Sequence, residues 1–212
     1  MSYYLNLSIL SNNLNNLPKT ERVKRLSAEA RRILSPEGDI ARDAAGRPFF
    51  PNRDADFSIS HSGALAAVSL VEGKNLRTGC DVELVRPRSK ARAIAQDFFT
   101  APERDYIESG GSFDETRFYR IWTLKECFLK LRGLSVFDMA GAPSFISGDG
   151  QFAFSASGAS PILFNIYELA GAGERYILAT ALEGTEMEQP EIRWFSQDSL
   201  VVCKSIKFTT GI

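Results

Sequence analysis

The sequence Thr78-Gly79-Cys80-Asp81-Val82-Glu83-Leu84 alternates apolar side chains with two acidic ones. Residues two apart on a strand share a face, so the alternation predicts a half-buried strand with Asp81 and Glu83 on one side. From Ser89 onward the apolar residues recur at helical spacing instead. A strand followed directly by helices indicates a mixed α+β fold.

The same two patterns extend outward to both ends of the chain. Period-two alternation or short apolar runs between turn residues predict strands at residues 3–9, 57–59, 64–71, 79–85, 152–155, 162–169, 176–182 and 193–207. The polar link Ser60-His61-Ser62-Gly63 between two of them is typical of a turn.

Helix signals lie between these strands. A helix is expected after Pro18, ending before Pro36 and Gly38. Thr100 with Glu103, and Ser112 with Glu115, form two predicted capping boxes, and the second helix should end near Arg132 at Gly133. Helices and antiparallel strands therefore occur in two halves, which we place at residues 1–100 and 101–212.

The composition excludes several classes of protein. With 212 residues, 44% of them hydrophobic, the chain can build a sizeable core. Its net charge of −1 provides no field for nucleic acid or an anionic membrane. No apolar run approaches the roughly 20 residues that cross a bilayer, and the N-terminus lacks a secretion signal. The three scattered cysteines complete the expectation of a cytoplasmic protein that binds neither nucleic acid nor membrane.

Asp81 and Glu83 are candidates for binding a cation. Two carboxylates on one face repel each other unless a cation neutralises them, and Mg²⁺ prefers oxygen ligands. The alternative is a solvent-facing strand edge, which this segment alone favours. The single histidine excludes a multi-histidine metal centre, so any metal should be bound by oxygen.

A second candidate segment is Ile121-Trp122-Thr123-Leu124-Lys125-Glu126-Cys127-Phe128-Leu129-Lys130. On a helix Glu126 and Lys130 share a face and form an ordinary ion pair, which is the favoured interpretation of this segment alone. The functional alternative adds Glu126 to the two acids, with Lys130 stabilising charge on a phosphate. His61 and Arg47 suit phosphate binding as well, although an exposed loop explains either residue.

Taken in order, these segments resemble the 4′-phosphopantetheinyl transferase superfamily, in its surfactin-synthetase-activating (Sfp-type) branch. Four motifs carry the resemblance: Gly46-Arg47-Pro48, Phe57-Ser58-Ile59-Ser60-His61-Ser62, Gly79-Cys80-Asp81-Val82-Glu83 and Trp122-Thr123-Leu124-Lys125-Glu126-Cys127-Phe128-Leu129-Lys130. The visible departure is Cys127, where the family usually has Ala or Ser.

The resemblance implies a fold, an activity and a set of roles. The fold would be a pseudo-dimer of two similar α+β halves, each an antiparallel sheet with helices, with the active site at their junction. The enzyme would transfer the phosphopantetheine of coenzyme A, its co-substrate, to a serine of an acyl or peptidyl carrier protein, releasing adenosine 3′,5′-bisphosphate. The implied metal is Mg²⁺, or Mn²⁺, at Asp81, Glu83 and Glu126. Arg47, Ser60 and His61 would lie near the 3′-phosphate, and Lys130 on the pyrophosphate.

Further expectations concern catalysis and partners. Asp81, Glu126 and Lys130 are the expected catalytic residues, with Glu126 as the base for the serine hydroxyl. The carrier protein, with an acidic helix, is expected to dock near residues 89–109, which include Lys90, Arg92 and Arg104. A pseudo-dimer favours a monomer.

Two other functions compete with this one. A Mg²⁺-dependent phosphodiester hydrolase would use the same acids but leaves Ser60-His61 and Gly46-Arg47-Pro48 without a role. A non-catalytic protein that binds coenzyme A or the carrier would need no complete set of acids.

Overall fold

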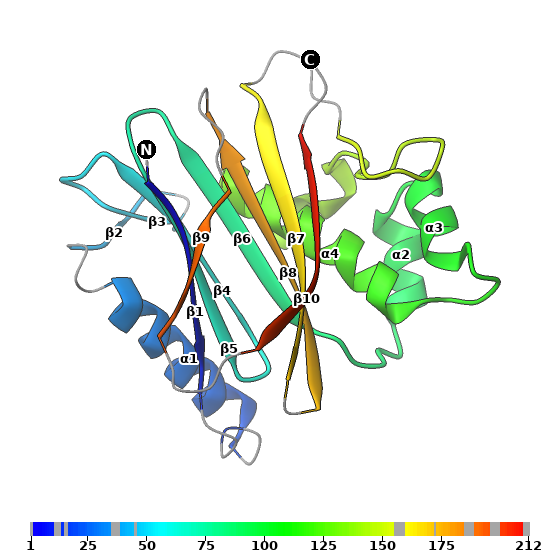
Figure 1. Cartoon of the computed structure of the whole chain (residues 1–212), viewed down its shortest axis with the longest axis horizontal. Coiled ribbons are helices and arrows are strands. Elements are labelled where there is room, and N and C mark those ends of the chain that lie inside the picture. The colour runs from blue at the N-terminus through cyan, green and yellow to red at the C-terminus, as the bar shows by residue number, and fades with distance from the viewer. Residues whose placement is uncertain are drawn as a thin grey trace.

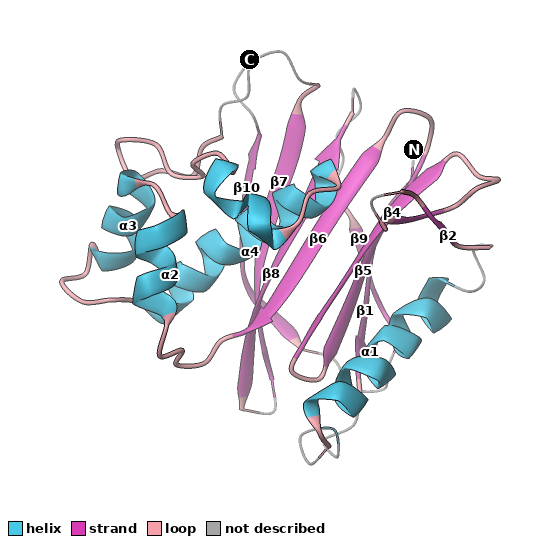
Figure 2. Ribbon diagram, turned by 180° about the vertical axis from the view of Figure 1, so that it is seen from behind, coloured by secondary structure: helices cyan, strands magenta, loops and turns pink. Residues whose placement is uncertain are grey.

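The computed structural model describes residues 2–10, 14, 17–34, 39–44, 46–154, 160–171, 173–184, 189–195 and 200–209. Within them two four-stranded sheets lie beside each other, and helices α1 and α4 both lie on the same face of the sheets (Figures 1 and 2). The predicted α+β fold is confirmed.

The first sheet has the strand order β4-β5-β1-β9. Its strands are β4 (Ala55–Ser62), β5 (Leu65–Glu72), β1 (Ser2–Ile9) and β9 (Glu191–Trp194). The pairs β4/β5 and β5/β1 are antiparallel as expected, whereas β1 and β9 are parallel. Helix α1 (Lys19–Leu34) places its buried residues against this sheet, and a hairpin of β2 (Ala41–Arg42) and β3 (Pro48–Phe49) lies beside it.

The second sheet has the order β10-β7-β8-β6 and is antiparallel throughout. Its strands are β10 (Val201–Thr209), β7 (Ile162–Gly171), β8 (Glu174–Glu183) and β6 (Arg77–Leu84). Helix α4 (Glu115–Arg132) packs on it, with α2 (Ala91–Phe98), α3 (Ala101–Glu108) and the 3₁₀ helix η3 (Val136–Gly141) beyond. The largest hydrophobic cluster lies between these helices and the sheet.

Side chains join the two sheets where the edge strands β4 and β6 meet. The backbone amides of Thr78, Val82 and Leu84 on β6 donate to side-chain oxygens of β4 at 2.9, 3.2 and 3.1 Å. The accepting side chains are those of Asp56, Ser60 and Ser62. We call this set of contacts the side-chain ladder. It explains why β4 carries small polar residues on alternate positions.

A buried ion pair ties α3 to α4. Lys125 Nζ lies 3.1 Å from Glu103 Oε2, and both side chains are fully buried. Lys125 also donates to the carbonyl of Pro143 at 3.0 Å. Glu103 accepts the amides of Thr100 at 2.8 Å and of Phe145 at 2.9 Å, which confirms the first predicted capping box.

Several local predictions need correction. Ser60, His61 and Ser62 belong to strand β4 and not to a turn, because two of their hydroxyls bond to β6. Helix α4 is capped by Asp114, which accepts from the amide of Arg117 at 3.0 Å, and not by Ser112. Among residues 152–154 only one isolated bridge forms, at Phe152.

Other local predictions are confirmed or stay open. Helix α4 ends at Gly133 with φ of 71°, as expected. Pro36, Gly38 and Ser155 lie outside the described residues. The division into halves 1–100 and 101–212 and the pseudo-dimer stay predictions. Strands pair across this boundary: β6 of the first predicted half pairs with β8 of the second, and β1 of the first pairs with β9 of the second. None of the helices in the described ranges is long and apolar enough to cross a membrane.

Candidate active site

Strand β6 positions the first carboxylate, Asp81. Its Oδ1 accepts hydrogen bonds from Ser60 Oγ at 2.8 Å and from Lys130 Nζ at 2.7 Å. The residue is only 5% exposed, so the interpretation as a solvent-facing strand edge is wrong for Asp81. Its Oδ2 is buried and has no hydrogen-bond partner among the described residues. Since a buried carboxylate oxygen is costly to leave unpaired, this atom indicates a site for a cation or donor.

Glu83 lies two residues further along the same face. Its oxygens accept from Ser62 Oγ at 2.9 Å and from Trp122 Nε1 at 3.2 Å. Burial, and next the charge of Asp81, raise the pKa of Glu83 above its ordinary value. Both donors are neutral, so the negative charge of Glu83 is not cancelled by them.

Helix α4 supplies Glu126 and Lys130. Burial raises the pKa of Glu126 to about 7, and the nearby charges of Asp81 and Glu83 add to the effect. Lys130 pairs with Asp81 and makes no ion pair with Glu126 within the described part of the chain, so the predicted intrahelical pair is not formed. Although burial alone lowers the pKa of Lys130, the charge of Asp81 raises it overall. The lysine is therefore a fixed cation beside three acids.

A close approach of β6 to α4 brings these groups together. A Cβ atom added to Gly79 would lie 2.4 Å from the carbonyl oxygen of Cys127 and 3.1 Å from Leu131. No larger residue fits without a shift of the helix. The glycine of the β6 motif thus sets the distance at which the acids of the strand face those of the helix.

The four residues line one cavity of about 360 Å³. Its wall comprises Ser27, Arg31, Arg42, Pro48, Ile59, Ser60, His61, Asp81, Val82, Glu83, Glu126 and Lys130. Burial lowers the pKa of His61, whose Nε2 lies 3.4 Å from Ser27 Oγ. A cavity lined by both acidic and basic side chains suits a phosphorylated ligand that also needs a cation.

The structure places two predicted phosphate-binding residues differently. Ser60 lines the cavity, but its hydroxyl is committed to Asp81 and to the amide of Val82. Arg47 does not line this cavity; its guanidinium contacts protein atoms, and it borders an adjoining cavity of about 220 Å³. Sequence reasoning missed Arg31 and Arg42 as residues of the site. The basic face of α1 was a signal for Arg31, and Arg42, in β2, had no comparable signal.

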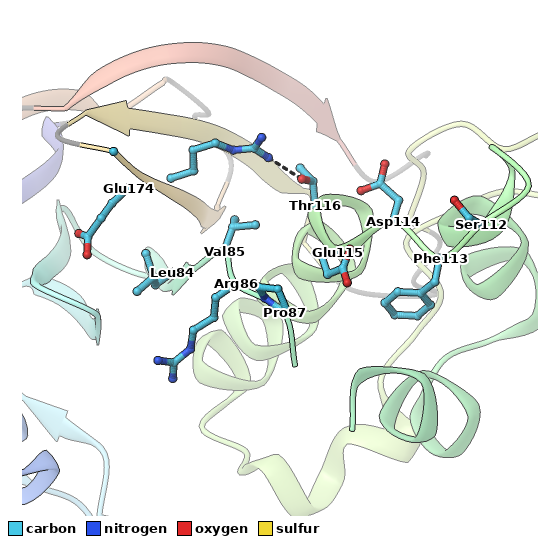
Figure 3. Close-up of a pocket in the computed structure, with 12 residues that line it drawn as sticks. Leu84, Val85, Arg86, Pro87, Ser112, Phe113, Asp114, Glu115, Thr116 and Glu174 are labelled. Atoms are coloured by element: carbon cyan, nitrogen blue, oxygen red, sulfur yellow. Dashed lines mark hydrogen bonds between the residues drawn. The ribbon is translucent and has the colours of Figure 1, made fainter. Parts of the chain in front are cut away.

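Further cavities continue along β6. One of about 690 Å³ shares His61 and Glu83 with the first and reaches Lys19, Arg22 and the exposed stretch 86–90. Another of about 690 Å³ follows between the end of β6 and the beginning of α4 (Figure 3). Arg175 donates to Thr116 there at 2.5 Å. Of the three acids, Glu83 therefore lines both the first and the second cavity.

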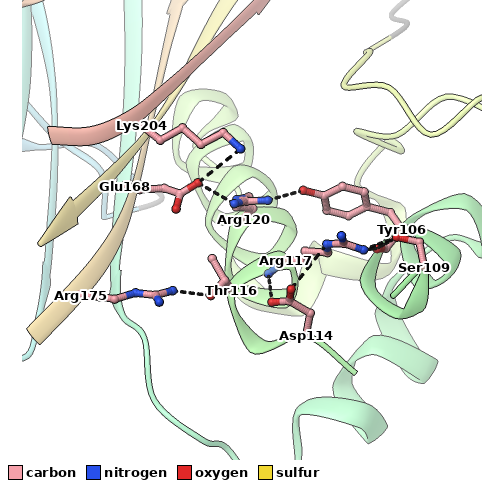
Figure 4. Close-up of polar contacts among 9 residues, drawn as sticks. All are labelled: Tyr106, Ser109, Asp114, Thr116, Arg117, Arg120, Glu168, Arg175 and Lys204. Carbon is pink, nitrogen blue, oxygen red and sulfur yellow. Dashed lines mark hydrogen bonds and ion pairs between the residues drawn. The ribbon is translucent and has the colours of Figure 1, made fainter. Parts of the chain in front are cut away.

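A polar network holds the N-terminal part of α4 (Figure 4). Arg120 donates to Glu168 of β7 at 2.6 Å and to Tyr106 of α3 at 2.7 Å, and Lys204 of β10 lies 4.0 Å from the same carboxylate. The helix that carries Glu126 and Lys130 is thus bonded to the sheet on one side and to α3 on the other.

The side chains of the three acids bear on whether the site can hold a metal ion. Within the described ranges no group of three or more His, Cys, Asp or Glu side chains is placed to hold a metal ion. Yet the unpartnered Oδ2 of Asp81 is buried beside two acids of raised pKa. Oxygen donors with excess negative charge fit a divalent cation such as Mg²⁺.

Comparison with known proteins gives consistent matches. Residues 77–181 match the family described as the 4′-phosphopantetheinyl transferase superfamily. This segment contains β6 and α4, and with them the three acids and Lys130.

Individual relatives carry the same description. The 4′-phosphopantetheinyl transferase AcpT of Escherichia coli is 33% identical over 129 residues, which cover 60% of this chain and 65% of AcpT. The 4′-phosphopantetheinyl transferase psf-1 of Bacillus pumilus is 31% identical over 45% of this chain and 40% of its own. The 4′-phosphopantetheinyl transferase HetI of Nostoc is 31% identical over 96 residues, which cover 43% of this chain and 40% of HetI. The matches thus span less than two thirds of each relative's length.

Proposed function

Residues 77–181 belong to the 4′-phosphopantetheinyl transferase superfamily, and from this premise we propose that the chain transfers 4′-phosphopantetheine from coenzyme A to a serine of a carrier protein. The observation that carries the proposal is the placement of Asp81. Its carboxylate is buried at the wall of a cavity shared with Glu83 and Glu126. One oxygen is bonded to Lys130, and the other has no hydrogen-bond partner in the part of the chain that the structure describes.

Coenzyme A is the proposed ligand of the cavities around Lys130. The basic wall formed by Arg31 and Arg42, with His61 beside them, suits the 3′-phosphate. Lys130 is proposed to contact the pyrophosphate, because its ammonium group is the cation nearest the acids. Proximity of Ser60 to the 3′-phosphate stays a prediction, whereas the contacts of Arg47 with Asp56 and with the carbonyl of Thr78 favour a role within the protein.

The carrier protein is proposed to approach through the second cavity. The cavity that shares Glu83 and His61 with the first opens at the exposed stretch 86–90, where Arg86, Arg88 and Lys90 lie. This stretch adjoins residues 89–109, the predicted docking segment. Positive charge there favours a carrier with an acidic helix, whether acyl or peptidyl.

The proposed step is a displacement at phosphorus. The serine oxygen forms a bond to the phosphorus of the phosphopantetheine, and the bond from that phosphorus to the bridging pyrophosphate oxygen breaks. The leaving group is adenosine 3′,5′-bisphosphate, whose new charge Lys130 stabilises. Glu126, in its ionised form, accepts the serine proton.

We propose Mg²⁺, with Mn²⁺ as a substitute, as the cation held by Asp81, Glu83 and Glu126. When bound, such an ion neutralises charge on the pyrophosphate. The three acids would bind the ion in their ionised form. Since the pKa values of Glu83 and Glu126 are raised, metal binding should release protons from these two residues.

Intact-protein mass spectrometry tests the proposal. Apo carrier proteins of several types are mixed with coenzyme A, Mg²⁺ and the protein, and we expect a mass gain of one phosphopantetheine group. Asp81→Ala should abolish it. No gain with coenzyme A still bound would identify a binding protein, and release of phosphopantetheine to water would identify a hydrolase. In Glu126→Gln, an unaltered pH–rate profile would exclude the base role.

The compartment, the assembly state and the branch are further parts of the proposal. We propose a cytoplasmic monomer of the Sfp-type branch. The three cysteines are all unpaired, which supports the proposed compartment. Size-exclusion chromatography with light scattering measures the assembly state directly.

A further inference from the structure

We propose that Arg47 is a positioning residue whose guanidinium holds β6 and the C-terminal end of α4 in place, and that it binds no phosphate of the substrate. The proposal rests on the function proposed above, and concerns how the reactive side chains on these two elements are kept in register.

The guanidinium of Arg47 is held by three hydrogen bonds to the protein. Its Nη2 donates to Asp56 Oδ2 at 2.6 Å and to the carbonyl of Thr78 at 3.2 Å, and its Nη1 donates to the carbonyl of Lys130. The side chain is only 12% exposed. One guanidinium thus bonds to three separate elements, β4, β6 and α4.

Both backbone contacts lie close to reactive groups. Thr78 is three residues before Asp81 on β6, and Lys130 is the residue whose ammonium group contacts Asp81. Arg47 therefore fixes the main chain at two points of the unit in which Lys130 meets Asp81. A shift of either point changes the distance between the two charges, and hence the transition-state contact that Lys130 is proposed to make.

The charge of Arg47 suits this position. The carbonyl of Lys130 belongs to the last turn of α4, where it also accepts the amide of Gly133 at 3.2 Å. Carbonyls of a last helical turn carry partial negative charge, and a buried cation there is favourable. Arg47 therefore stabilises the helix end as a cap would.

Asp56 completes the arrangement and makes a phosphate role unfavourable. Its Oδ2 accepts both Arg47 and the amide of Thr78, at 2.6 and 2.9 Å, so its charge already neutralises Arg47. The three hydrogen bonds of Arg47 use three of its five N–H donors, and the half-buried carboxylate leaves little net positive charge for a phosphate. Arg31 and Arg42 line the cavity instead, and neither forms an ion pair with the described residues.

The test compares Arg47→Gln with His61→Ala, using coenzyme A and 3′-dephospho-coenzyme A at saturating carrier. For Arg47→Gln we expect kcat to fall about 10- to 100-fold, the effect of losing charged hydrogen bonds, equally with both co-substrates and with KM within about twofold. For His61→Ala we expect a raised KM with coenzyme A only. Arg47→Lys should restore little, since the compact ammonium group lacks the planar fork with which the guanidinium spans acceptors on three elements.

Other outcomes refute the proposal. A raised KM for coenzyme A alone in Arg47→Gln would make Arg47 a phosphate ligand, and unchanged kinetics would remove its role. If Arg47→Gln fails to fold, Asp56→Asn replaces it, with a smaller fall in kcat expected and the same independence of the 3′-phosphate. Failure of the proposed function is distinguishable from failure of this proposal. In that case the unmodified protein would transfer phosphopantetheine to no carrier. Calorimetry would still compare the affinities of the variants for coenzyme A and 3′-dephospho-coenzyme A.

Discussion

Replacing Lys125 by methionine should destabilise the protein far more than replacing an exposed cation. Lys125 and Glu103 are fully buried, their charged atoms are 3.1 Å apart, and burial lowers the pKa of Lys125. In Lys125→Met, Glu103 keeps the two amide hydrogen bonds that it accepts but loses the one cation that pairs with it among the described residues. Removing one partner of a buried pair costs about 3–5 kcal/mol. For a chain of this size that corresponds to a fall in Tm of roughly 6–20 °C.

Urea unfolding followed by circular dichroism measures this cost. The matched control is Arg92→Met, because Arg92 pairs at 2.5 Å with Glu108 of the same helix α3 but both side chains are more than half exposed. Its loss should be below about 1 kcal/mol. The double variant Glu103→Gln/Lys125→Met should lose less than Lys125→Met alone, since no uncompensated charge remains. A loss in Lys125→Met no larger than in Arg92→Met would refute the reasoning.

Three further predictions concern the site. Gly79→Ala should cost at least about 1–3 kcal/mol and most of the transfer activity, because its Cβ would lie 2.4 Å from the carbonyl of Cys127; equal stability in urea would contradict the close approach. Ser60→Ala should cost about 1–3 kcal/mol, since an amide of β6 and Asp81 both lose a partner; a smaller loss in urea would mean that water replaces the hydroxyl. Burial lowers the pKa of His61, so its ring is neutral at pH 7, and a bound phosphate should favour the protonated ring. Affinity for coenzyme A should then rise as pH falls from 8 to 6, with proton uptake in calorimetry; the same pH dependence for 3′-dephospho-coenzyme A would exclude this cause.

Much of the fold was predictable because local rules govern it. The alternation around Asp81 correctly predicted strand β6, and Gly133 correctly predicted where α4 ends, because each pattern reflects short-range backbone geometry. The stretch Ser60-His61-Ser62 was mistaken for a turn because polar residues on a strand usually face solvent, whereas here Ser60 and Ser62 bond to another strand and His61 lines the cavity.

The site was predictable in its residue types and not in its pairing. Spacing alone placed Asp81 beside Glu83 and Glu126 beside Lys130. The choice of Asp81 as the partner of Lys130 depends on how closely α4 approaches β6, which no local pattern encodes. The same holds for Arg31 and Arg42, which reach the cavity from α1 and from the β2–β3 hairpin.

The side-chain ladder between β4 and β6 has a genetic consequence. In an ordinary sheet every residue contributes the same amide and carbonyl, so hardly any codon change removes a hydrogen bond between strands. Here the acceptors are the side chains of Asp56, Ser60 and Ser62, each specified by its own codon. One nucleotide substitution can therefore delete one contact while leaving both sheets intact. Selection can adjust the attachment between the two sheets in single steps, and with it the rigidity of the acids that lie along the boundary.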